Sequence, residues 1–236
     1  MVAQMVEHSQ SQQGSTQPVL FAGDGVSLTG QVDYPRIPCD SRGYPLLFVI
    51  QHATCTTRQG YAHIARLGTE LGMAVFRWDK RGTGSSGAGA AGSVNQDTLY
   101  AYAAALNQAS IDRTRVVIFA QNEGSILLAE DFRRFKAIQK PLGVVLAGNM
   151  LDEEQVLAIE APVHIVVSKN DWNSWQIYAE AASRSHARHY GGHSSFYVAP
   201  NTNRRLMYAN GGTFHRGAEQ SIRTWMEQVC RISASV

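Results

Sequence analysis

The sequence predicts one α/β domain with a mostly parallel sheet of about eight strands, an antiparallel start and helices on both faces. Three observations favour this fold. Five continuous apolar runs are typical of parallel strands that are buried on both faces. An alternating hairpin precedes these runs, and segments with helical spacing separate them. The runs are Pro45–Gln51, Met73–Trp78, Arg115–Ala120, Leu142–Gly148 and Pro162–Ser168.

The first element follows a polar N-terminal segment. Met1–Gln17 is rich in Gln and Ser and has too few apolar side chains to pack, so we expect a disordered tail before a single domain over Pro18–Val236. Two strand-like runs then flank a Gly-Asp-Gly turn, and apolar residues alternate with polar ones over Val26–Tyr34. This pattern predicts an antiparallel hairpin.

Helices and further strands follow in alternation. Tyr61–Leu71 and Leu99–Leu106 keep a near-helical spacing of apolar residues, and each ends at a glycine or a polar turn. We expect the last strand at Arg204–Tyr208, just before a glycine-rich loop. Right-handed crossovers between such strands bring their carboxyl ends to one edge of the sheet, which is where ligands bind.

Composition and charge exclude several classes of protein. The chain has 236 residues, 44% of them hydrophobic, which is enough for one large core. Its net charge of +2 is spread along the chain, so we expect no nucleic-acid partner. The three cysteines are too widely spaced for a disulfide framework or a paired-cysteine zinc site. No apolar run approaches about 18 residues, and the N-terminus lacks the charged start and apolar stretch of a secretory signal, so we expect a soluble, cytoplasmic protein with no membrane partner. We also expect no cofactor.

Residues that can carry chemistry follow the ends of the predicted strands. His52 and Cys55 follow the first buried run, and the loop Asp79–Ser86 follows the second. Asp171 follows the fifth run, and His215 follows the glycine-rich loop. Because the strand ends share one edge of the sheet, we expect these side chains to surround one site.

The turn after the third run has Asn122 at its centre. Ala120 and Gly124 lie two residues to either side and are small enough for the backbone to fold tightly, as in the G-x-S-x-G turn that carries a serine nucleophile. Such a turn needs a positive φ at its centre, which asparagine adopts at a lower cost than most residues. The segment therefore predicts a nucleophile elbow with asparagine in the place of serine.

With these residues, the chain resembles the α/β-hydrolase superfamily over essentially all of Pro18–Val236. That family has an Asp-x-Arg-Gly-x-Gly-x-Ser loop after its fourth strand, and Asp79–Ser86 matches it at every fixed position. The order Asn122, Asp171, His215 reproduces the family's nucleophile, acid and base. The resemblance implies the α/β-hydrolase fold, a catalytic site at these three positions, and a small ester, thioester or similar acyl compound as substrate.

The sequence departs from the family pattern at three places. Asn122 replaces the serine, Ala53 replaces the glycine of a His-Gly loop, and Gly148–Pro162 is too short for a large cap domain. The supporting donors are still expected. The backbone N–H of Glu123, at the start of a helix, and a second N–H from Ala53 or Thr54 would form an oxyanion hole.

The missing group is the nucleophile. A carboxamide cannot pass a proton to His215 as a serine hydroxyl does, so Asn122 should not form an acyl-enzyme. We therefore expect an inactive or weakly active hydrolase, whether Asn122 is natural or engineered, in which Asn122→Ser raises esterase activity. Deamidation to a nucleophilic aspartate is a minor route. The alternatives are a non-catalytic ligand- or partner-binding relative, and a non-covalent acid–base enzyme that uses Asp171 and His215.

The other polar residues have plainer interpretations beside the functional ones. Asp79 and Arg81 are expected to brace the fold next to the site. The remaining pocket candidates are His52, Cys55, Trp172 and Trp175. Of these, Cys55 is a small buried thiol unless a base lies beside it. Trp172 and Trp175 each fit a helix cap as well as a pocket wall. The histidines His186, His189 and His193 lack a carboxylate or cysteine ligand in a known spacing, so we expect no metal.

Overall fold

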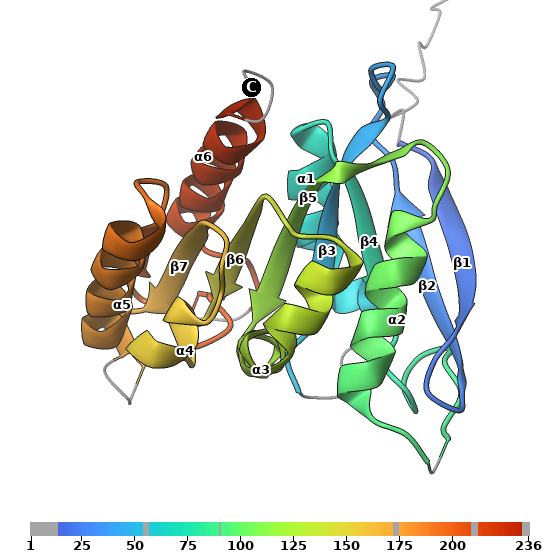
Figure 1. Cartoon of the computed structure of the whole chain (residues 1–236), viewed down its shortest axis with the longest axis horizontal. Coiled ribbons are helices and arrows are strands. Elements are labelled where there is room, and N and C mark those ends of the chain that lie inside the picture. Colours follow the sequence, from blue (N-terminus) through green and yellow to red (C-terminus); the bar gives the residue numbers. More distant parts are fainter. Residues whose placement is uncertain (1–13, 54–56, 90, 172–174, 209–211, 233–236) are drawn as a thin grey trace, which may run out of the picture.

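One sheet of eight strands runs through the described part of the chain (Figure 1). The computed structural model describes residues 14–53, 57–89, 91–171, 175–208 and 212–232. The strands are β1 (Thr16–Ala22), β2 (Ser27–Asp33), β3 (Tyr44–Ile50), β4 (Ala74–Trp78), β5 (Ile111–Gln121), β6 (Gly143–Ala147), β7 (Val163–Ser168) and β8 (Ser195–Ala199). Their order is β1-β2-β4-β3-β5-β6-β7-β8. β2 pairs antiparallel with β1 and β4, and all other neighbours pair parallel, which confirms the predicted sheet.

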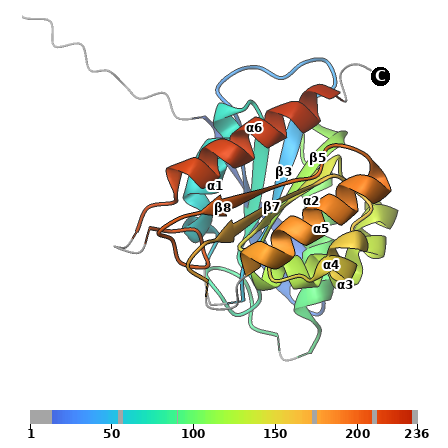
Figure 2. The ribbon, with the colours of Figure 1, turned by 90° about the vertical axis from the view of Figure 1, so that its left-hand side faces the viewer.

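Helices cover both faces of the sheet (Figure 2). They are the 3-10 helix η1 (Arg58–Tyr61), α1 (Ala62–Glu70), α2 (Val94–Leu106), α3 (Glu123–Ile138), α4 (Glu153–Leu157), α5 (Trp175–Tyr190) and α6 (Arg216–Ile232). α1 and α6 share a core that includes Tyr61 and Trp225. α2 to α5 share the opposite core, which includes Tyr102 and Phe132. Two cores form because successive side chains of a buried strand point to opposite faces.

The hairpin forms as predicted but begins earlier than expected. Thr16 lies opposite Asp33 in the β1–β2 ladder, and its Oγ1 donates to Asp33 Oδ1 at 3.1 Å. Tyr34 N donates to Ser15 O at 2.8 Å. The predicted tail over residues 1–17 is therefore too long, because these hydrogen bonds hold the polar end of β1 in the sheet. Residues 1–13 lie outside the described part of the chain.

The prediction for the last strand is wrong. β8 pairs parallel with β7 along its whole length, and its run Phe196–Val198 is rich in residues that favour strands. The segment predicted instead, Arg204–Tyr208, is a loop joined to its neighbours by isolated bridges. Leu206 in this loop has φ of 62°, a left-handed conformation that interrupts an extended strand. The loop crosses the carboxyl ends of the strands, next to the elbow.

The connection between Gly148 and Pro162 carries no separate lid, as predicted. These residues are all described, and their one helix, α4, has five residues. The side chains of Asp152 and Gln155 cap its N-terminus, and the helix packs against α3 and α5. None of the described helices is long and apolar enough to cross a membrane.

Candidate functional site

The predicted elbow is formed between β5 and α3. Asn122 has φ of 49° and ψ of −116°, the strained conformation that the sequence suggested. Its backbone N–H donates to Ala147 O at 2.9 Å, which ties the turn to the end of β6. Gly124 is required for close packing, because a Cβ there would lie 2.8 Å from Ile50 O and 2.9 Å from Gln51 O. The backbone therefore has the shape of an elbow that presents one side chain at the sheet edge.

The side chain at the apex is held by the protein itself. Asn122 is only 5% exposed. With the carboxamide oriented so that its nitrogen meets acceptors, Nδ2 donates to Arg204 O at 3.1 Å and to Gly148 O at 3.2 Å. Gly148 has φ of 63°, and a Cβ there would lie 2.3 Å from Arg204 O. Asn122 thus fastens the Arg204 loop to the end of β6 instead of facing a substrate.

The predicted oxyanion donor at Ala53 is also occupied. Its backbone N–H donates to the carboxylate oxygen Oε2 of Glu123 at 3.0 Å. Burial alone would raise the pKa of Glu123, but backbone N–H groups, with the charges of His52 and Lys80, lower it below its ordinary value of 4.5. The position that an oxyanion would use already holds an anion. The other predicted donor, Thr54, lies outside the described residues, as do Cys55 and Trp172.

The charge of Glu123 gives a pH-dependent contribution to stability. A folded-state pKa below the unfolded value stabilises the protein above pH 4.5, and this contribution is lost as the pH falls through the folded-state value. We expect Glu123→Gln to lower the free energy of unfolding by about 1 kcal/mol at about pH 7, allowing for partial exposure, and by less at an acidic pH below 4.5. Urea denaturation of both proteins at the two pH values measures this. An equal loss at both would show that the carboxylate charge contributes nothing.

The predicted pair of Asp171 and His215 is not formed. Both oxygens of Asp171 accept from the guanidinium of Arg204, at 2.8 Å from Nε and 3.0 Å from Nη2. Nδ1 of His215 accepts from the backbone N–H of Ala218 at 3.0 Å. No hydrogen bond or ion pair joins the two residues, both of which the structure describes. The prediction fails because Arg204 offers a bidentate partner to the acid, while His215 caps a free N–H at the start of α6.

This capping contact also limits the chemistry of His215. A nitrogen that accepts from Ala218 carries no proton in the neutral ring, so the proton lies on Nε2. Burial lowers the pKa of His215, which favours this neutral form. A serine at position 122 would need Nε2 as its proton acceptor. The ring therefore has the wrong tautomer for the predicted role.

His52 belongs to a buried hydrogen-bonded chain beneath the site. Its backbone N–H donates to Tyr61 Oη at 2.9 Å, and Tyr61 Oη donates to Gln121 Oε1 at 2.8 Å. Nε2 of Gln121 continues the chain to Arg205 O at 3.1 Å. Burial first, and then the charges of Arg205 and Lys80, lower the pKa of His52. These contacts make His52 a support for the loop over the elbow.

Asp79 and Arg81 brace the fold, as the sequence suggested. Asp79 accepts from the backbone N–H of Arg58 at 2.7 Å and of Ser85 at 3.0 Å, and it forms an ion pair with the Arg58 guanidinium. Arg81 binds both carboxylate oxygens of Asp97, at 2.7 Å and 2.9 Å. These contacts hold the loop after β4 against η1 and α2.

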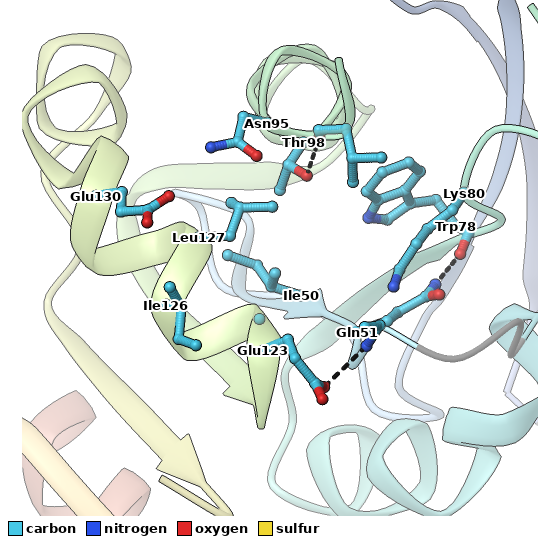
Figure 3. A pocket seen from close by; sticks show the side chains of 13 residues that line it. Ile50, Gln51, Trp78, Lys80, Asn95, Thr98, Glu123, Ile126, Leu127 and Glu130 are labelled. Carbon is cyan, nitrogen blue, oxygen red and sulfur yellow. Dashed lines mark hydrogen bonds between the residues drawn. The ribbon is translucent and has the colours of Figure 1, made fainter. Parts of the chain in front are cut away.

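A pocket opens beside the elbow, between the N-terminal turns of α2 and α3 (Figure 3). Its volume is about 330 Å³. The surface that lines it is mostly apolar, but several elements also contribute polar side chains. The lining includes Ile50, Gln51, Trp78, Lys80, Thr98, Glu123, Leu127 and Glu130. The sequence predicted the strand ends that border this pocket. It did not predict that Gln51, Trp78 and Lys80 line it. Their one signal was their place at the ends of β3 and β4.

Two other predicted features lie away from this pocket. Trp175 packs against the core under α2 to α5 and is not part of the pocket lining. His186 is buried, with Nδ1 2.7 Å from Ser194 Oγ and Nε2 2.7 Å from Ile159 O. Its ring therefore has a structural role. Among the described residues, no cluster of histidine, cysteine and acidic side chains could hold a metal ion.

Comparison with known proteins gives a likeness of structure only. No protein-family model and no curated protein matches the sequence. DcsB in complex with its substrate analogue has a TM-score of 0.69 at 12% identity, with 92% of this chain and 100% of that chain covered. Proline iminopeptidase of Mycobacterium smegmatis has a TM-score of 0.66 at 11% identity over 92% and 100%. An esterase of Pyrococcus furiosus has a TM-score of 0.66 at 11% identity over 97% and 95%. The chain has the α/β-hydrolase fold.

Proposed function

We propose that this protein binds a small acyl compound on a hydrolase fold and does not hydrolyse it through a covalent intermediate. The observation that carries the proposal is that the carboxamide of Asn122 is buried between the backbone carbonyls of Arg204 and Gly148, to which its nitrogen donates once the amide oxygen and nitrogen are exchanged. A residue in this position must attack the substrate for covalent hydrolysis to occur. An amide that is chemically inert and held by two carbonyl groups cannot do so.

The partners of the missing nucleophile are engaged as well. The carboxylate of Glu123 takes the backbone donor of Ala53, and a negative charge there repels a developing oxyanion. Asp171 binds Arg204, and His215 caps α6. The non-covalent alternative, in which Asp171 and His215 activate water together, loses its support because the two side chains are not paired.

The pocket supports a retained binding function. It lies directly beside the elbow, and its volume of about 330 Å³ is at the lower end of the range for small-molecule sites. Esterases and peptidases are among the solved structures that share the fold, which favours an acyl compound as the ancestral substrate. A serine-bearing form of this site would belong to an enzyme for small esters, thioesters or similar compounds.

A panel of p-nitrophenyl esters with increasing acyl length tests the proposal. We expect the protein to release p-nitrophenol no faster than an equal concentration of serum albumin with each ester, because Asn122 offers no nucleophile. Because no catalysed rate is expected, the binding of acyl compounds is measured directly by calorimetry. Saturable turnover that depends on acyl length, and that His215→Ala removes, would contradict the proposal.

A further inference from the structure

Two polar atoms in the wall of the pocket have no hydrogen-bond partner. Gln51 and Trp78 both line the pocket, and they are only 2% and 1% exposed. The acceptor Gln51 Oε1 and the donor Trp78 Nε1 are both buried without a partner. Buried side-chain atoms of this kind are rare in folded proteins, because each loses its hydrogen bonds to water. An unpaired donor and an unpaired acceptor in one pocket indicate a ligand that supplies both complements.

The amide of Gln51 has a fixed orientation. Nε2 of Gln51 donates to the backbone carbonyl of Trp78, so the amide of Gln51 is held with its oxygen as the unused end. In Figure 3, Trp78 lies across the pocket from Leu127, and Gln51 lies below it beside Lys80. A head group with one donor and one acceptor would complement the Gln51 oxygen and the Trp78 indole N–H.

The charges around the pocket exclude a carboxylate as the preferred head group. Among the described residues of the lining, Lys80 is the one cationic side chain, and its Nζ already donates to the backbone carbonyl of His52. Two acidic side chains, Glu123 and Glu130, line the same pocket. An anionic ligand would meet an excess of negative charge, whereas an uncharged one avoids its repulsion. An ammonium group would satisfy Gln51 Oε1 but has no acceptor for the indole N–H.

The rest of the lining suits a short hydrocarbon chain. Ile50, Val94, Ile126 and Leu127 supply apolar surface between α2 and α3. The small volume limits the length of the chain that can be buried with the head group. Apolar burial supplies the affinity and the two polar atoms supply the selectivity, as in most small-molecule sites.

We propose that the pocket binds a small, uncharged primary carboxamide with a short apolar tail. Its carbonyl oxygen accepts from Trp78 Nε1, and its N–H donates to Gln51 Oε1. This inference rests on the proposed function, since it names the acyl compound that the pocket retains without cleaving it.

Calorimetry with compounds that share an unbranched six-carbon chain tests the head group. We expect hexanamide to bind at least tenfold more tightly than methyl hexanoate, which lacks the donor, hexylamine, which lacks the acceptor, and hexanoate, which is charged. Equal or tighter binding of any of these three, or no binding of hexanamide, would overturn the inference. Binding of hexanoate alone would leave the proposed function standing, whereas turnover of p-nitrophenyl esters would contradict the proposed function whatever hexanamide does.

Three variants locate the binding site. Trp78→Phe keeps an aromatic ring and removes the donor, so we expect hexanamide to bind about tenfold more weakly and hexylamine to bind as before. Leu127→Trp fills the pocket and should abolish hexanamide binding. Tyr178→Phe, at an exposed position on α5, is the control and should change nothing. Thermal unfolding shows that each variant is folded. Unchanged hexanamide binding in folded Leu127→Trp would place the ligand elsewhere and overturn the inference.

Discussion

Replacing Arg81 with methionine should lower the free energy of unfolding by about 3–5 kcal/mol, because it leaves a buried carboxylate without its counter-charge. The Asp97 side chain is fully buried, and both of its oxygens accept from Arg81. The same carboxylate accepts from the backbone N–H of Asp24 at 2.7 Å. Arg81 also donates to the backbone carbonyls of Asp24 and Ala91, so one substitution loosens the hairpin, the loop after β4 and α2. Urea denaturation measures the loss.

Arg113→Met is the matched control for this substitution. Arg113 lies on β5 with an exposed side chain, so we expect a change within about 0.5 kcal/mol. A loss below about 1 kcal/mol in Arg81→Met would show that Asp97 tolerates burial without the guanidinium.

Replacing Arg204 with methionine should cost about 3 kcal/mol, and more than His215→Ala. The Asp171 side chain is 4% exposed and both oxygens are held by Arg204, so removal of the guanidinium takes away its bidentate partner. His215→Ala removes one capping contact to Ala218, which is worth about 1 kcal/mol. If Asp171 and His215 formed a catalytic acid–base pair, the losses caused by the two substitutions would instead depend on each other.

The two substitutions therefore distinguish the structural role of Asp171 from a catalytic one. Free energies of unfolding from urea denaturation, measured for both single variants and for the double variant, provide the comparison. Additive losses mean that the two contacts are independent, because separate sites add. A strong coupling between Arg204→Met and His215→Ala would place Asp171 and His215 in one network and contradict the geometry described above.

The sequence was sufficient to predict the buried parallel strands β3 to β7. β3 to β7 are continuous apolar runs because they are buried on both faces, and that pattern is visible without any structure. β8 lacks this signal, since it lies at the edge of the sheet and Phe196 is half exposed. The apolar residues Leu206 and Met207 favour a strand in the sequence. In the structure, the left-handed φ of Leu206 prevents an extended strand there.

The site was predictable in its positions but not in its partners. The order of residues after the strand ends correctly placed Asn122 at a turn with a positive φ. It could not show that Arg204, only eleven residues before His215, would bind Asp171 first. It also gave no sign that the side chain of Glu123 would turn back to the N–H of Ala53. Such contacts depend on side-chain direction and on competition between donors, which spacing along the chain does not record.

The geometry changes the result expected for Asn122→Ser. A new hydroxyl alone would still face an occupied donor at Ala53 and a His215 ring that offers no acceptor through Nε2. Loss of a single triad member leaves at most about 10³ to 10⁴-fold acceleration over water in a serine protease, and here two members and a donor are engaged elsewhere. We therefore expect little gain from serine, in contrast to the expectation from the sequence.

Labelling by a fluorophosphonate probe, followed by intact-mass measurement, tests the central claim most directly. The probe reacts with a serine only where a base and an oxyanion hole activate it, so a known serine hydrolase in the same experiment is the positive control. We expect that neither the protein nor Asn122→Ser gains the mass of the probe under conditions that label the control completely. Stoichiometric labelling of Asn122→Ser at position 122 would show that the base and the oxyanion donors are functional, and would contradict the claim that the protein's own contacts occupy them.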